Sequence, residues 1–88
     1  MSIDDTQDMR ALMQDMPSDV AALIQRRVEC NHWSGEDPYD AERAAFIARA
    51  VRRARCDRVD ADEAVLARRY AERADVLARL AKARDQYW

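Results

Sequence analysis

The chain has 88 residues, with 15 Lys and Arg against 17 Asp and Glu, and a formal net charge of −2. This length allows one domain with a small core, and the charge balance argues against a general binder of nucleic acids or anionic membranes. One Gly and two Pro supply little turn chemistry, which excludes most β folds. We therefore expect a single all-α domain over 1–88, a small three- to four-helix bundle.

The first predicted helix spans 4–15 and ends before Pro17, because proline disfavours helical geometry in the residue before it. Its apolar residues have the spacing of one helix face: Met9, Leu12, Met13 and Met16. Flexible methionine side chains suit either a loosely packed edge or a groove that takes a partner. We expect this methionine stripe to pack inside the bundle or to bind another protein.

The second predicted helix spans 19–30, with Ser18 as its N-cap and Asn31 as its C-cap. Its buried face is predicted to carry Val20, Leu23, Ile24 and Val28. The segment that follows, CNHWSGEDPYD, holds the only histidine and the only glycine of the chain. We expect Gly35 to adopt a positive φ there, since glycine does so without steric cost. Trp33 is expected to close the end of the bundle as a large buried anchor.

The third predicted helix spans 38–55, with Asp37 at the N-cap and Pro38 at the first helical position. One apolar arc on it is expected to face the core: Phe46, Ile47, Ala50, Val51 and Ala54. Arg43 projects into the middle of that arc. A buried guanidinium needs a partner, so we expect Arg43 to reach Glu29 or Glu36.

The last predicted helix is the longest, spanning 61–86 after a capping box formed by Asp60 and Glu63. Its large residues form a seam: Leu66, Tyr70, Leu77 and Leu80. A continuous helix of this length would be about 39 Å long and would overhang the others or pair with a second copy, which predicts a homodimer. The alternative is a break near Arg73–Asp75, where Asp75 can form a second cap.

Cys30 and Cys56 end consecutive predicted helices. If these helices are antiparallel, the two cysteines lie about 20 Å or more apart, too far for a disulfide or a shared zinc ion with His32. The C-terminal end of a helix also disfavours a thiolate at Cys30, so we expect no catalytic cysteine. Without a signal-peptide pattern or an apolar run of membrane-spanning length, the chain is expected to be cytoplasmic with two reduced thiols.

No set of catalytic residues is apparent, so the sequence predicts a non-enzymatic protein–protein interaction module without a cofactor. A second interpretation is binding of nucleic acid or of an acidic partner through the arginines of the third helix, Arg49, Arg52, Arg53 and Arg55. These arginines spread over a wide arc, which makes nucleic acid the weaker interpretation. A third interpretation is a small ligand or metal site in the candidate loop, formed by His32, Trp33, Glu36 and Arg43.

Overall fold

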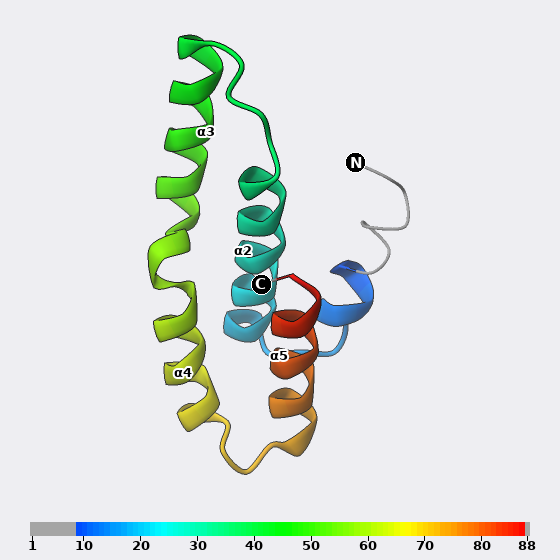
Figure 1. Cartoon of the computed structure of the whole chain (residues 1–88). Coiled ribbons are helices and arrows are strands. Elements are labelled where there is room, and N and C mark those ends of the chain that lie inside the picture. The colour runs from blue at the N-terminus through cyan, green and yellow to red at the C-terminus, as the bar shows by residue number, and fades with distance from the viewer. Residues whose placement is uncertain (1–8, 88) are drawn as a thin grey trace.

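The computed structural model describes residues 9–87, and within them the chain is helical and contains no strand. The helices are α2 (Ser18–Ser34), α3 (Ala41–Ala54), α4 (Val59–Arg69) and α5 (Ala74–Gln86), with a 3₁₀ turn, η1 (Cys56–Arg58), between α3 and α4 (Figure 1). Residues 9–13 are helical as well and belong to the first predicted helix. The remainder of that prediction, 4–8, lies outside the described residues. The predicted all-α bundle is confirmed.

The helices form an elongated body with extents of 47 × 28 × 19 Å. In Figure 1, α3, η1 and α4 follow one another as one long bent rod that runs along α2, and α5 then folds back beside α4 and α2. The segment 35–40, which lies outside the helices, carries the chain past the end of α2 before α3 begins. As a result, the first turns of α3 stand beyond the end of α2.

The hydrophobic core lies between α2, α4, α5 and the helical turn at 9–13. It consists of Leu12, Val20, Leu23, Ile24, Val28, Val59, Leu66, Val76, Leu80, Ala83 and Tyr87. The predicted buried face of α2 is therefore confirmed in full. α3 contributes no residue to this cluster, and among its residues Ala54 alone is buried.

The predicted continuous helix over 61–86 is wrong, and the alternative of a break is what the structure shows. α4 ends at Arg69 and α5 begins at Ala74, so the last two helices form an antiparallel hairpin. Arg73 donates two hydrogen bonds to Asp75 at the new helix start, at 2.9 and 3.0 Å. Since the predicted helix 61–86 is divided in two, the homodimer prediction loses the argument that was based on the overhang of that helix.

Two predicted helix starts are displaced. α3 begins at Ala41, with Asp40 rather than Asp37 as the N-cap; an Asp40 carboxylate oxygen accepts a hydrogen bond of 2.7 Å from the Arg43 backbone N–H. The capping box expected at Asp60 and Glu63 does not form, because α4 already begins at Val59. The Glu63 side chain is not available for a capping box, because it is buried and paired with arginines from other helices.

The predicted end of α2 is also wrong. The helix continues through Asn31 to Ser34, and Gly35 follows with φ −93°, an ordinary helical value rather than a positive one. Residues with positive φ among the described ones are instead Asp15 (61°) and Arg55 (53°). Arg55 thus takes the left-handed conformation that ends α3 and starts η1.

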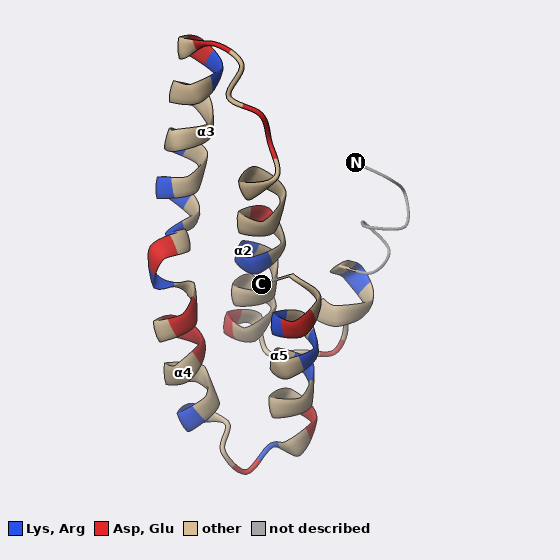
Figure 2. Cartoon of the chain, viewed as in Figure 1, with Lys and Arg blue, Asp and Glu red and all other residues tan. Residues whose placement is uncertain are grey.

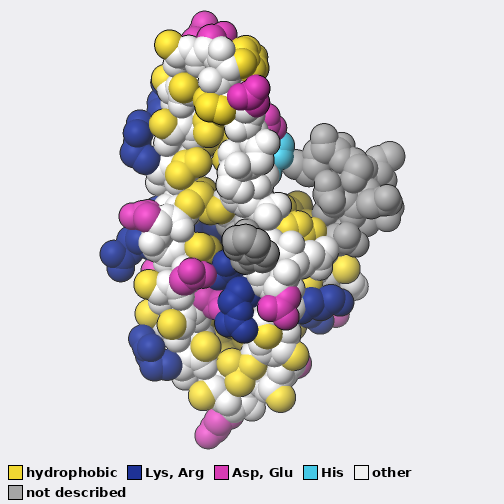
Figure 3. Space-filling view, in the orientation of Figure 1, with side chains coloured by type: hydrophobic (Ala, Val, Ile, Leu, Met, Phe, Trp, Pro, Cys, Tyr) yellow, Lys and Arg dark blue, Asp and Glu magenta, His cyan; other side chains and the backbone are white. Residues whose placement is uncertain are grey.

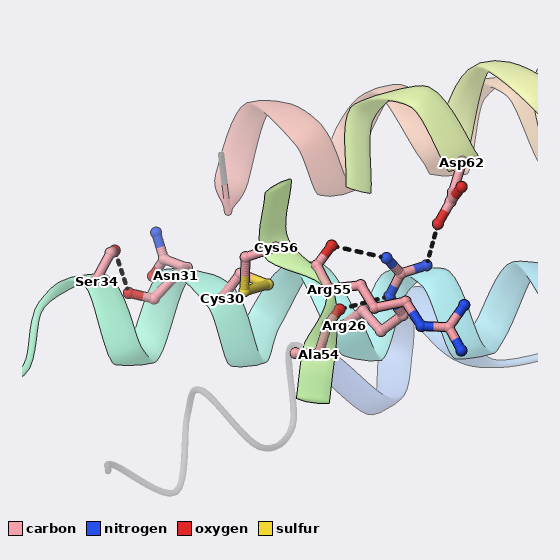
Figure 4. Close-up of a disulfide and its surroundings, with 8 residues drawn as sticks. All are labelled: Arg26, Cys30, Asn31, Ser34, Ala54, Arg55, Cys56 and Asp62. Carbon is pink, nitrogen blue, oxygen red and sulfur yellow. Dashed lines mark hydrogen bonds and ion pairs between the residues drawn. A yellow bond between two sulfur atoms is a disulfide. The ribbon is translucent and has the colours of Figure 1, made fainter. Parts of the chain in front are cut away.

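The prediction of two reduced thiols is contradicted. Cys30 and Cys56 form a disulfide with 5.6 Å between their Cα atoms (Figure 4). The two helices are antiparallel, as predicted. The predicted separation was wrong because it assumed that the start of α3 lies level with the end of α2. Because 35–40 carries the start of α3 beyond α2, the end of α3 lies level with Cys30, one turn inside α2. The disulfide weighs against the predicted cytoplasmic location, because such bonds are typical of oxidising compartments.

Candidate functional site

The four residues of the candidate loop lie together at the junction of α2 and α3. Glu36 connects them: its carboxylate pairs with His32 Nε2 at 3.1 Å and with Arg43 Nη2 at 3.4 Å. Of the two acceptors predicted for Arg43, the structure therefore selects Glu36. These side chains are about one-third exposed, so they form a rim and not a buried clamp.

Aromatic rings pack around the same arginine. The Arg43 guanidinium lies 5.6 Å from the Trp33 ring centroid and 5.3 Å from that of Phe46. Trp33 and Phe46 meet edge to face, with 5.5 Å between ring centroids. Trp33 is only half-buried, so the prediction that it closes the bundle as a buried anchor is wrong. The cluster instead holds the start of α3 against the end of α2.

Beside this cluster the surface is hollowed between α2, α3 and the helical turn at 9–13. The hollow has a volume of about 550 Å³, and its apolar lining comes from Met9, Val28, Trp33, Phe46, Ala50 and Ala54. Volumes of this size are typical of sites that hold a small molecule or an anchoring side chain. Phe46 stands at its edge and also borders a second hollow of about 340 Å³, which Tyr39 and Arg49 help to line.

Large apolar side chains are exposed around these hollows. Tyr39 is 74% exposed and Phe46 46% exposed, although Phe46 was predicted to face the core. Figure 3 shows hydrophobic side chains at the surface over the upper part of the molecule, where α3 lies in Figure 1, and over its lower part as well. The exposure of Phe46 could have been predicted from its position on the helical wheel. At 100° per residue it lies about 60° from Arg43, at the edge of the predicted apolar arc.

The arginines of the alternative interpretation spread over the exposed side of α3 and its C-cap. All four are exposed: Arg49, Arg52, Arg53 and Arg55. Arg49 and Arg53 lie four residues apart on the same side of α3, whereas Arg52 is turned about 100° from Arg53, and Arg55 lies outside the helix. On the helical wheel Arg52 lies about 60° from Arg49, so the three arginines of α3 spread over an arc of about 100°.

Other arginines bind inside the fold and were not predicted to do so. Arg26 donates to the carbonyls of Ala54 (2.8 Å) and Arg55 (3.0 Å) and to Asp62 (2.9 Å), and so holds the end of α3 next to the disulfide (Figure 4). At the other end of α2, Asp19 accepts a hydrogen bond from Tyr70 and pairs with Arg69. Partial burial would raise the pKa of Asp19, but these bonds outweigh it and lower that pKa.

The two predicted interaction stripes pack against the chain itself. In the seam, Leu66 and Leu80 are buried in the core, and Tyr70 packs against it. In the methionine stripe, Leu12 is buried and the three methionines pack partly against the same core. Neither stripe is a continuous free face.

No helix among the described residues is long and apolar enough to cross a bilayer. The same residues contain no group of three His, Cys, Asp or Glu side chains placed to hold a metal ion. Comparison with protein-family models, curated proteins and solved structures finds no match to this chain. The exposed cluster at the start of α3 is therefore interpreted from its own geometry.

Proposed function

We propose that this protein is a non-enzymatic protein–protein interaction module whose binding surface is the Trp33 face, defined as Trp33, Tyr39, Arg43 and Phe46. One observation carries the proposal: α3 adds nothing to the core cluster, yet its Phe46 is 46% exposed at the edge of a hollow of about 550 Å³. Exposing such side chains to water is unfavourable, and a partner that covers them recovers the free energy of burial.

The composition of the Trp33 face supports the proposal. Tryptophan, tyrosine and arginine are the residue types that most often dominate binding energy at protein interfaces. Glu36 and the aromatic rings fix the position of Arg43, so little conformational entropy would be lost when a partner binds there. The core between α2, α4 and α5 is separate from this face and supports the helix α2 that carries Trp33.

Site-specific photo-crosslinking in living cells tests this proposal. Replacing Phe46 with benzoylphenylalanine keeps an aromatic ring at the position, and illumination should yield a discrete covalent adduct with a protein. The matched control places the same group at Ala48, which is exposed on the opposite side of α3. Adducts at neither position, or equal adducts at both, would refute the proposed surface.

A further inference from the structure

A line of charged and aromatic residues runs along the outside of α3. We call it the Phe46 stripe; its members are Glu42, Phe46, Arg49 and Arg53. Their spacings of four, three and four residues place them on one side of a helix. All four are exposed. Within residues 9–87, no ion pair or hydrogen bond is formed by the side chain of Glu42, Arg49 or Arg53.

The charges of the Phe46 stripe are ordered along the helix. Its acidic member stands at the start of α3, and its two arginines stand in the second half (Figure 2). Arg49 and Arg53 are four residues apart, a spacing at which like charges on a helix repel. Nothing among the described residues neutralises them, so the stripe is complementary to an acidic group placed beside its C-terminal half.

A second α3 in antiparallel orientation presents such a group. We propose that the Phe46 stripe is a homodimer interface in which two copies of α3 pack antiparallel about a two-fold axis between Phe46 and Arg49. This geometry places Glu42 of each copy opposite Arg53 of the other. It also places Phe46 opposite Arg49 of the second copy, an arrangement suited to a cation–π contact.

The symmetry makes the pairing specific. Residues equally distant from the two-fold axis meet, and each contact occurs twice. A parallel pair of helices would instead set Glu42 against Glu42 and arginine against arginine, which is repulsive. The stripe is also accessible, because α3 turns its buried residue, Ala54, toward α2, about 100° around the helix from Arg53.

This inference rests on the proposed function through Phe46, the residue that the Phe46 stripe shares with the Trp33 face, and it names a second copy of the chain as the partner at that position. The pairs are exposed and charged, so the dimer should be weak and should dissociate further as salt rises. It is tested by sedimentation equilibrium of the purified, oxidised protein over a range of concentrations. At high concentration and low salt, the mass should approach twice the 10.2 kDa of the monomer.

Charge reversal gives the decisive comparison. Glu42→Arg and Arg53→Glu should each weaken dimerisation at least about tenfold, because each sets like charges opposite one another. The double variant Glu42→Arg/Arg53→Glu should recover most of the wild-type affinity. Glu72→Arg makes the same change in net charge as Glu42→Arg, at an exposed site outside the stripe, and should leave the association unchanged.

Two results would overturn the dimer. One is a wild-type chain that stays monomeric at every concentration; the other is a dimer that the single reversals leave intact or the double reversal fails to restore. Circular dichroism of each variant confirms that it is folded. A monomeric chain whose residue 46 still crosslinks to a different protein would refute the second copy as partner and leave the proposed function standing.

Discussion

Arg27 of α2 and Glu63 of α4 form an ion pair inside the protein, with 3.0 Å between Arg27 Nη2 and Glu63 Oε1. Their side chains are only 4% and 9% exposed. Glu63 also accepts from Arg84 of α5 at 3.1 Å, so one carboxylate links three helices. This polar centre joins α4 to α2 through Arg27 and to α5 through Arg84.

Glu63→Ala is expected to lower the free energy of unfolding by about 3 kcal/mol or more, because it leaves the buried Arg27 charge without its buried partner. Urea denaturation measures this change. Asp60→Ala removes the other acceptor of the same arginine, but that carboxylate is 84% exposed, so its loss should cost less than about 1 kcal/mol. Equal costs for the two variants would contradict the role assigned to burial.

The Cys30–Cys56 disulfide closes a loop with a sequence separation of 26. Cross-linking a loop of this size restricts the unfolded chain, and reduction is therefore expected to lower the free energy of unfolding by about 3–4 kcal/mol. Denaturation with and without reductant measures the difference.

The double variant Cys30→Ser/Cys56→Ser is the control, and its stability should not respond to reductant. Because α3 lies outside the core cluster, its amides should gain hydrogen exchange on reduction more than those of α5. Two titratable thiols in the denatured but unreduced protein would contradict the disulfide.

Helical periodicity was sufficient to predict the all-α fold and the buried face of α2. It did not predict the buried face of α3 correctly. A helical wheel gives the direction of an apolar arc, but it does not show which neighbouring element covers that arc. The covering depends on how far the chain extends between helices, and here the segment 35–40 places the start of α3 beyond the end of α2. That one shift explains both the exposed Phe46 and the disulfide that the sequence argument excluded.

The break before α5 was equally hard to predict, since Tyr70–Arg73 contains neither glycine nor proline. The turn is held by partners distant in sequence: the Tyr70 hydroxyl donates to Asp19 at 2.9 Å, and α5 covers the core only if the chain reverses there. The contact of Arg43 within the candidate loop was easier to predict. Its residues lie within 12 positions of one another, and the contact between Arg43 and Glu36 needs only the correct direction of α3.

Asp75 at the start of α5 is expected to titrate unusually low. The two hydrogen bonds from Arg73 lower the pKa of Asp75 from 3.8 to about 2. The folded-state pKa is thus below the unfolded value, so the stabilising contribution is complete above pH 3.8 and is lost as the pH falls through about 2. Carboxyl NMR should show this midpoint, and Arg73→Ala should return it toward 3.8. A normal midpoint in the wild type would exclude the bidentate pair in solution.

Gly35→Ala is expected to stabilise the protein by about 0.4–1 kcal/mol. The φ of −93° suits alanine, and an added Cβ would lie 3.6 Å from the nearest atom, the His32 carbonyl oxygen, which is ordinary contact. Alanine restricts the unfolded chain more than glycine does, so the gain arises there. Thermal unfolding measures it. A clear loss of stability would indicate the positive φ that the sequence suggested.

Arg55→Gly is also expected to stabilise the protein, but here the gain arises in the folded state and not in the unfolded chain. Arg55 holds φ 53° and ψ 52° at the C-cap of α3, a conformation that costs an L-residue about 1 kcal/mol and that glycine adopts freely. Its carbonyl, which accepts from Arg26, is retained in the variant. Arg55→Ala removes the same side chain but keeps the unfavourable Cβ, so it should show no comparable gain in urea denaturation. If alanine and glycine stabilised equally, relief of charge repulsion from nearby arginines would be the cause instead of the backbone conformation.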